Sequence, residues 1–253
     1  MRITFLGTGT SQGIPVIACK CPVCLSGDVN DKRLRTSVFI EVDGVNIVID
    51  TGPDFRQQML SNKVEKLDAV VFTHSHKDHV AGLDDVRAFN FIYNMDMPIY
   101  GEQNVLEALK REFHYAFEGI KHLGVPRLIL NEIKNETFFI KGVKVIPIRA
   151  FHYKLPVFGF RINDFTYITD ANYIEDAEFE KIKNSKVLVL NALRKNKHIS
   201  HFTLEEAISV FKRSQSKKGY FTHISHLMGM HKDVNEELPD DISLASDNLV
   251  LNL

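Results

Sequence analysis

The residues best suited to chemistry lie together in one short stretch. Residues 70–87 read VVFTHSHKDHVAGLDDVR, and the histidines follow directly on an apolar run that predicts a buried strand. Within six positions the stretch holds three histidines and an aspartate: His74, His76, Asp78 and His79. Such groups cost on the order of 1–3 kcal/mol each when they are left unpaired beside a core. A Zn, Mn or Fe ion, bound by alternating residues of an extended loop, removes that cost, and a solvated histidine-rich turn is the alternative.

The elements that must position this cluster are strands and helices in mixed order. β-branched and aromatic runs predict strands at residues 2–6, 36–42, 45–49, 68–72, 98–100, 137–140, 143–148, 157–162, 165–169, 186–190, 218–222 and 248–252. Helices are predicted near 54–61, 103–116, 175–182, 203–213 and 227–236, with a capping box at Thr203 and Glu206. This order indicates two sheets between helix layers, and residues 117–136 read as a lid or loop.

The composition limits the class of protein. With 253 residues and 44% hydrophobic composition the chain can form a sizeable core, and we expect a single domain over residues 1–253. Lys and Arg number 31 against 32 Asp and Glu, so no global basic field indicates nucleic-acid or membrane binding. No apolar run has bilayer-spanning length and no signal-peptide pattern opens the sequence, so we expect a cytoplasmic protein.

The histidine stretch resembles the H-x-H-x-D-H signature of the metallo-β-lactamase superfamily of binuclear hydrolases. The resemblance implies an α/β fold, the αββα sandwich with two mixed β-sheets between helix layers. It continues along nearly the whole chain, because three further residues end predicted strands in the order of that family's remaining ligands: His152, Asp170 and His223.

What the resemblance implies is a pair of divalent catalytic metal ions, Mn²⁺ or Zn²⁺, that activate a hydroxide. His74, His76 and His152 would bind one ion. Asp78, His79 and His223 would bind the second ion, and Asp170 would be shared. Intact Asp78 and Asp170 favour the phosphodiesterase side of the superfamily over β-lactam cleavage. Asp50, which ends the strand 45–49, is the predicted acceptor for a ligand histidine, with an Asx-turn as the alternative.

All three cysteines of the chain fall in one C-x-C-x-x-C motif: Cys19, Cys21 and Cys24. An odd number so closely spaced cannot form a disulfide framework, whereas three thiolates suit one tetrahedral zinc ion. We predict His226 as the fourth ligand of this structural Zn²⁺, because it follows His223 by three residues and could face the opposite way. The alternative is that the thiols are reduced and bind nothing.

Two features point to one branch of the superfamily. The cysteine-rich loop, at about residues 13–33, and GTGTSQGIP at residues 7–15 together resemble the PhnP phosphodiesterases, which open cyclic phosphate esters. His201, directly before the helix at 203, resembles the non-ligand histidine that stands beside the leaving group, with His198 as the spare candidate. His201 and Asp78 are therefore the predicted catalytic residues, although His201 could also be a surface histidine at a helix entry.

The predicted function is hydrolysis of a small phosphodiester, cyclic ones included. A nuclease that processes tRNA 3' ends would use the same ligands but would need an RNA-gripping arm, and no basic Gly/Pro-rich insertion is present. A thioesterase or lactonase of the same fold and a non-catalytic metal-dependent binding protein are also compatible with these residues. We expect no membrane partner, and the charge pattern gives no strong indication of nucleic-acid binding. A homodimer is compatible with the sequence.

Overall fold

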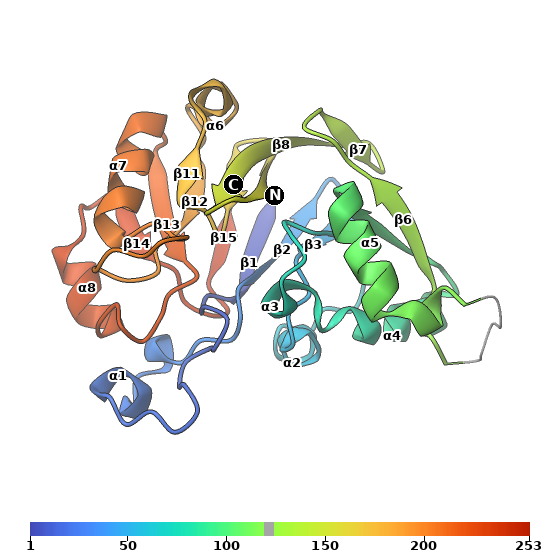
Figure 1. Cartoon of the computed structure of the whole chain (residues 1–253), viewed down its shortest axis with the longest axis horizontal. Helices are drawn as coiled ribbons and strands as arrows, with labels where there is room; N and C mark the ends of the chain where they lie inside the picture. Colours follow the sequence, from blue (N-terminus) through green and yellow to red (C-terminus); the bar gives the residue numbers. More distant parts are fainter. Residues whose placement is uncertain (119–123) are drawn as a thin grey trace.

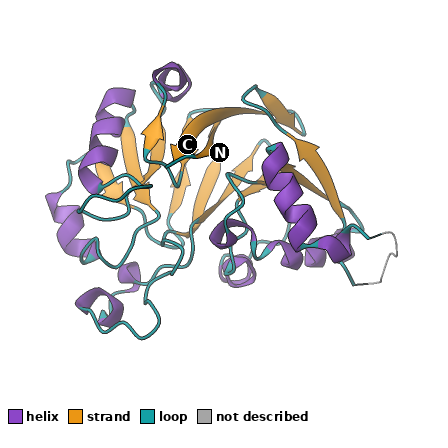
Figure 2. Ribbon diagram, in the orientation of Figure 1, coloured by secondary structure: helices purple, strands orange, loops and turns teal. Residues whose placement is uncertain are grey.

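Two β-sheets pack face to face in the computed structural model, which describes residues 1–118 and 124–253, and helices cover both outer sides (Figure 1, Figure 2). This is the αββα sandwich that the sequence predicts. The first sheet contains β1 (Arg2–Gly7), β2 (Ser37–Val42), β3 (Val45–Ile49), β4 (Ala69–Val71), β5 (Met97–Gly101), β6 (Leu128–Glu132) and β15 (Val250–Asn252). Its strand order is β15-β1-β2-β3-β4-β5-β6, antiparallel from β15 to β3 and parallel from β3 to β6.

The second sheet is also mixed. Its strands are β7 (Phe138–Ile140), β8 (Val143–His152), β9 (Leu155–Ile162), β10 (Phe165–Ile168), β11 (Tyr173–Ile174), β12 (Val187–Asn191), β13 (Lys218–Thr222) and β14 (Ile242–Leu244). The order is β11-β8-β9-β10-β12-β13-β14, and β7 pairs with β8. Strands β10, β12, β13 and β14 are parallel, so their carboxyl ends meet at one edge of the sheet.

Helices form the outer layers. They are α1 (Pro22–Leu25), α2 (Phe55–Ser61), α3 (Lys77–Val80), α4 (Arg87–Tyr93), α5 (Gln103–Glu112), α6 (Phe179–Ile182), α7 (Leu204–Ser214) and α8 (His231–Glu237), with short 3₁₀ turns at Val29–Asp31, Leu83–Val86, His114–Ala116 and Asp176–Glu178. One apolar cluster joins α2, α4 and α5 to the first sheet, and another joins α6, α7 and α8 to the second. Within the described residues no helix is long and apolar enough to cross a membrane.

The main core lies between the two sheets. Phe5 and Ile40 of the first sheet pack in one cluster with Phe158 and Tyr167 of the second, and all four are essentially fully buried. Burying one such side chain contributes roughly 1.5–3 kcal/mol. Because this interface fixes the sheets against each other, residues that follow β4, β8, β10 and β13 are held at a common edge.

Several local predictions hold and others do not. The capping box of Thr203 and Glu206 is formed at the start of α7, as predicted. The lid or loop expected at 117–136 is wrong for Leu128–Glu132, because these residues pair with β5 as the edge strand β6; residues 119–123 lie outside the described part of the chain. Helices α1, α3 and α4 and strands β11 and β14 have no counterpart among the predicted elements.

Candidate metal centres

The predicted ligand stretch leaves the first sheet at the end of β4 and turns into a short helix. His74 follows the strand, and Asp78 and His79 lie in the single turn of α3, with His76 at its N-cap position. The predicted extended loop therefore holds as far as His76, whose backbone is extended, whereas Asp78 and His79 lie in a helical turn instead.

Two glycines make room for this turn. A Cβ on Gly52 would lie 2.2 Å from the carbonyl oxygen of Asp78, and one on Gly82 would lie 2.2 Å from the carbonyl oxygen of Gly52. The backbone of Thr51 accepts a hydrogen bond from Gly82 and donates one to the carbonyl of His79 at 2.7 Å. The segment after β3 therefore holds the C-terminal part of α3 and the residues that follow it.

Three histidines have buried ring nitrogens that make no hydrogen bond of acceptable geometry among the described residues, although carboxylate oxygens lie near two of them. These are Nε2 of His74, Nε2 of His79 and both nitrogens of His223. Each histidine is at most 1% exposed, so bulk solvent does not reach these nitrogens. Because an unsatisfied buried nitrogen costs on the order of 1–3 kcal/mol, this donor set fits metal ligation.

Asp50 lies where an acceptor behind a ligand histidine should lie. Its Oδ2 is 2.7 Å from Nδ1 of His79, and its carboxylate also accepts from the backbone and hydroxyl of Thr73 at 2.9 and 2.8 Å. The Thr73 hydroxyl is in turn 3.0 Å from Nδ1 of His74. A carboxylate at Nδ1 keeps the proton there and leaves Nε2 as the metal-binding nitrogen.

Asp170 sits at the centre of the cluster. Its Oδ2 is 3.1 Å from Nε2 of His79, and its Oδ1 is 3.2 Å from Nε2 of His223 and 3.0 Å from Nε2 of His201. Asp78 contributes Oδ2 at 3.3 Å from His79 and 3.6 Å from His223. The potential ligand atoms of Asp78, His79, Asp170 and His223 all lie within 4.8 Å of one another.

The carboxylates make this position favour positive charge. Burial alone would lower the pKa of His79, yet Asp170, Asp50 and Asp78 raise it well above its ordinary value. Burial alone would likewise raise the pKa of Asp170, but His223 and His79 hold it well below its usual range. A protein interior that stabilises cationic charge so strongly suits a divalent cation.

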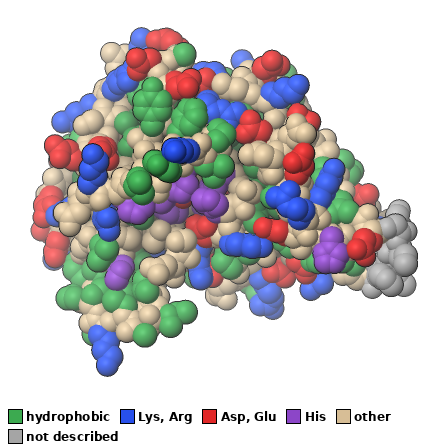
Figure 3. All heavy atoms as spheres, viewed as in Figure 1, with side chains coloured by type: hydrophobic (Ala, Val, Ile, Leu, Met, Phe, Trp, Pro, Cys, Tyr) green, Lys and Arg blue, Asp and Glu red, His purple; other side chains and the backbone are tan. Residues whose placement is uncertain are grey.

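The second predicted ligand group is more open. The His74 and His76 rings are 4.6 Å apart, and the His152 ring lies 5.2 Å from His76 and 5.9 Å from His74. Nδ1 of His152 donates to the carbonyl of Ser200 at 2.9 Å, which leaves Nε2 free, and burial lowers the pKa of His152 to about 4. Histidines gather in a band on the face shown in Figure 3, so the site is open to solvent there.

The structure brings His201 into this cluster. Its ring is 4.5 Å from that of His152, and its Nε2 is 3.0 Å from Asp170. His152, Asp170 and His201 also have potential ligand atoms within 4.8 Å of one another, so His201 stands as close as a ligand would. Sequence reasoning missed the carbonyl of Ser200 and the hydroxyl of Thr73, because backbone acceptors and common hydroxyls leave no motif.

Side chains that could receive a phosphate are mostly engaged elsewhere. Arg194 donates to the carbonyls of Asn196 and Lys197, and Lys195 pairs with Glu237. A pocket of about 760 Å³ lies away from the histidines, between α2 and α4, and its walls include Phe55, Met59, Phe89 and Ile92.

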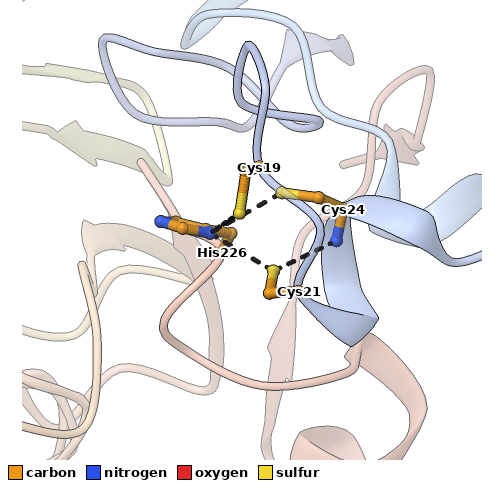
Figure 4. Close-up of side chains that lie close together, drawn as sticks. All are labelled: Cys19, Cys21, Cys24 and His226. Carbon is orange, nitrogen blue, oxygen red and sulfur yellow. Dashed lines mark hydrogen bonds between the residues drawn. The ribbon is translucent and has the colours of Figure 1, made fainter.

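A separate thiolate centre joins the cysteine loop to the segment after β13 (Figure 4). Nδ1 of His226 lies 3.3 Å from Sγ of Cys19, 3.3 Å from Sγ of Cys21 and 3.6 Å from Sγ of Cys24. These separations are the edges of a tetrahedron with bonds of roughly 2.0–2.3 Å, the values for zinc. A hydrogen bond from the Cys24 backbone lowers the pKa of Cys21 to about 6, which favours the thiolate.

Comparisons with known proteins identify the class. The family model described as "Beta-lactamase superfamily domain" matches residues 45–224, so the chain belongs to the beta-lactamase superfamily. A crystal structure of "a New Diphosphatase from the PhnP Family" is 39% identical, superposes with a TM-score of 0.93 and covers 99% of this chain and 97% of that one. This likeness places the chain in the PhnP family.

Two further relatives extend the comparison. Zn²⁺-bound PqqB from Methylobacterium extorquens has a TM-score of 0.81 at 18% identity, covering 100% of both chains, and shows the shared fold. A protein named "Octanoyltransferase" from Porphyromonas gingivalis is 40% identical over 252 residues, which are 98% of this chain and 51% of that protein. The chain spans about half the length of the curated relatives it matches.

Proposed function

We propose that this chain hydrolyses small phosphodiesters, cyclic ones included, with two divalent metal ions, Mn²⁺ or Zn²⁺. Membership of the beta-lactamase superfamily supports hydrolysis in general. The observation that carries the finer proposal is the position of His201, whose Nε2 lies 3.0 Å from the central carboxylate of Asp170. The 39% identical relative is a diphosphatase, so a phosphoanhydride is the first related substrate to test.

The donor atoms divide between two ions. Asp78, His79, Asp170 and His223 would hold one, since their ligand atoms already converge. His74, His76 and His152 would hold the second, with Asp170 shared. When bound, two such ions polarise a phosphoryl oxygen and lower the pKa of a water molecule toward neutrality.

His201 has a different task, which concerns the departing group. Its ring projects into the cluster and is only 8% exposed, so bulk water does not compete at Nε2. A proton on Nε2 can pass to the ester oxygen as the bond between phosphorus and that oxygen breaks, and the leaving group departs as an alcohol. His201 then retains a neutral ring.

A leaving-group series tests this role. Replacing His201 with Ala should keep both metal ions and lower the turnover of alkyl phosphodiesters by roughly 10²–10⁴-fold, with a smaller loss for p-nitrophenyl esters. His114 is an exposed histidine on the 114–116 turn. His114→Ala is therefore the matched control, and its metal content and turnover should equal those of the parent protein. Loss of metal in His201→Ala would make His201 a ligand, and undiminished turnover of alkyl esters would remove it from the reaction.

Acyl chemistry is the principal competitor, given the relative named "Octanoyltransferase". Acyl transfer through a covalent intermediate needs a nucleophile such as a thiol, and all three thiols of the chain surround His226. Direct comparison of bis-p-nitrophenyl phosphate with an octanoyl thioester decides between the reactions. Preferred hydrolysis of the thioester would overturn the proposal in favour of a thioesterase.

A nuclease and a binding protein would each have a simple experimental signature. Salt-sensitive binding and 3' cleavage of a structured RNA would favour a nuclease. Stable metal binding without turnover of any ester in the panel would favour a metal-dependent binding protein. The Cys19, Cys21, Cys24 and His226 centre is proposed to hold a structural Zn²⁺ in every case, because Nδ1 of His226 lies 3.3–3.6 Å from all three sulfur atoms and the four donors lie within 4.8 Å of one another.

A further inference from the structure

We propose that Asn172 is a positioning residue that sets the orientation of His152, an inference that rests on the proposed two-ion arrangement. Asn172 lies directly before β11, and its side chain bridges the turn after His152 and the loop that leads to α7. Its Oδ1 accepts a hydrogen bond from the backbone amide of Tyr153 at 2.6 Å. Its Nδ2 donates to the backbone carbonyl of Ile199 at 3.2 Å.

These contacts close a ring of hydrogen bonds around the His152 side chain. Nδ1 of His152 donates to the carbonyl of Ser200 at 2.9 Å. The neighbouring carbonyl, that of Ile199, is the one that Asn172 holds. On the other side, Asn172 holds the amide of Tyr153, the residue that directly follows His152. Asn172 therefore restrains both the backbone that carries the histidine and the acceptor that its ring contacts.

The orientation of the His152 ring matters because the ring faces two other predicted ligands. It lies 5.2 Å from the His76 ring and 5.9 Å from the His74 ring. The hydrogen bond to Ser200 turns Nδ1 away from these rings and leaves Nε2 for a metal ion. A displaced Ser200 carbonyl would turn the ring, and Nε2 would then no longer converge with the other two histidines.

The turn after His152 also needs support, because its backbone conformation is strained. His152 and Leu155 pair across β8 and β9, so Tyr153 and Lys154 form a two-residue hairpin loop. Tyr153 has a φ of 59°, in the left-handed region, where glycine is the usual residue of such loops. The hydrogen bond from its amide to Asn172 offsets part of this strain and holds the loop beside the ligand.

Asn172 can hold these groups because its own backbone is fixed. Its amide donates to the carbonyl of Phe151 at 2.9 Å, and Tyr173 pairs with Phe151 between β11 and β8. On the preceding residue, the fully buried Asn191 side chain bonds both the amide and the carbonyl of Ala171, at 2.8 and 2.9 Å. These backbone contacts do not involve the Asn172 side chain, so its removal leaves them in place.

The two partners of Asn172 require different chemistry. The amide of Tyr153 needs an acceptor and the carbonyl of Ile199 needs a donor, and the asparagine side chain supplies one of each. A water molecule could bond the same two groups, but it would not connect them to a fixed backbone. Replacing Asn172 should therefore loosen the two segments relative to each other without unfolding the sheet.

Competition with a chelator measures this effect in the zinc-loaded protein. Asn172→Ala should weaken the ion assigned to His74, His76 and His152 by roughly tenfold, the lower end of the range for a residue behind a ligand histidine. The ion assigned to Asp78, His79 and His223 should keep its affinity. A general loss of stability would weaken both ions, so selective loss of one distinguishes positioning from stabilisation.

Asn90→Ala is the matched control. Asn90 lies on α4, is fully buried, and also bridges backbone groups, since its Nδ2 donates to the carbonyls of Met95 and Arg127 at 2.8 and 3.1 Å. Its replacement should lower the thermal stability while both catalytic ions keep the affinity of the parent protein.

A double-mutant cycle tests whether Asn172 acts through His152. In a His152→Ala background, the further change Asn172→Ala should leave the remaining metal affinity unchanged. In a His223→Ala background, the same change should still weaken the ion that His152 helps to hold. An equal effect of Asn172→Ala in both backgrounds would show that it does not act through His152.

Hydrogen exchange supplies a readout that needs no metal ion. In the metal-free protein, the amide of Tyr153 should exchange faster in Asn172→Ala than in the parent or in Asn90→Ala, because it loses its acceptor. Parent-like affinity for both ions in Asn172→Ala would overturn the inference. If the parent bound only one catalytic ion, the two-ion arrangement would fail; unchanged exchange at Tyr153 would then overturn the positioning role as well, and faster exchange would support it.

Discussion

Asp50→Asn should weaken metal binding at the position formed by Asp78, His79, Asp170 and His223 while leaving the fold intact. The substitution keeps the shape of the side chain but replaces one acceptor oxygen with an NH₂ donor. In the parent, Oδ1 accepts from the Thr73 backbone and Oδ2 accepts from the Thr73 hydroxyl and faces Nδ1 of His79. If the NH₂ group occupies the position of Oδ1, it faces the Thr73 backbone amide. Both groups are donors, so the hydrogen bond between them is lost.

In the opposite orientation the NH₂ group faces His79. It then donates to Nδ1, and the His79 proton moves to Nε2, the nitrogen that lies 3.1 Å from Asp170 and should bind metal. Either outcome breaks one charge-assisted bond, worth about 1.5–3 kcal/mol. Loss of a carboxylate behind a ligand histidine commonly costs roughly 10–100-fold in metal affinity, and tenfold corresponds to about 1.4 kcal/mol. The expected loss of metal affinity is therefore of the same size as the free energy of the broken hydrogen bond.

Competition with a chelator, followed by elemental analysis, measures this affinity. Asp68→Asn is the matched control: Asp68 is also buried, accepts from the Asn46 backbone and pairs with Lys141, but lies at the opposite end of β4. Unchanged metal affinity in Asp50→Asn would refute the reasoning. An equal loss in Asp68→Asn would show that general destabilisation, not the His79 tautomer, is responsible.

The remaining predictions concern the carboxylates, the two kinds of centre and pH. Asp78→Ala and Asp170→Asn should each abolish hydrolysis with circular dichroism unchanged; near-normal rates with metals bound would exclude the two-ion arrangement. Cys21→Ser should lose only the thiolate-bound zinc and His74→Ala only catalytic metal, as elemental analysis can establish; loss of the catalytic pair in Cys21→Ser would contradict this. Burial raises the pKa of Asp247 to about 6, so the folded state holds this proton more tightly and the free energy of unfolding falls as pH rises from about 4 to 6. Asp247→Asn should remove up to about 3 kcal/mol of this fall in urea unfolding at the two pH values, and an unchanged pH dependence would show that Asp247 is not its source.

Most of the strands could be predicted from the sequence because they are strongly apolar and because turn-forming residues separate them. The strands predicted at 36–42 and 45–49 form the hairpin of β2 and β3, and its turn residues Asp43 and Gly44 both have positive φ, 50° and 76°. Edge strand β6 was not readable, because Leu128–Glu132 is half-buried and lacks a clear alternation. Helix α4 was missed since its aromatic-rich sequence has weak helix propensity, and packing of Phe89 determines the conformation.

The ligand identities were accessible from motif and chain order, but their geometry was not. Asp50, Asp170 and His223 all end strands in the left-handed region, with φ of 64°, 52° and 55°. Asp and His are enriched among the non-glycine residues that adopt it, yet nothing in a linear pattern shows that three strand ends will do so together. The contact between the His198 and His201 rings was equally hidden, because it depends on ring orientation.

The separate behaviour expected of Cys21→Ser follows from how one loop serves both centres. His223 and His226 are only three residues apart, and yet they face different sets of donors. Between them Ile224 is 2% exposed, donates to the carbonyl of Thr8 at 2.9 Å and accepts from the amide of Thr10 at 3.1 Å. This pairing with the segment after β1 fixes the backbone beside His223 whether or not the thiolates hold zinc. Removing one thiolate should therefore disturb His226 and the cysteine loop, while His223 keeps its place opposite Asp170.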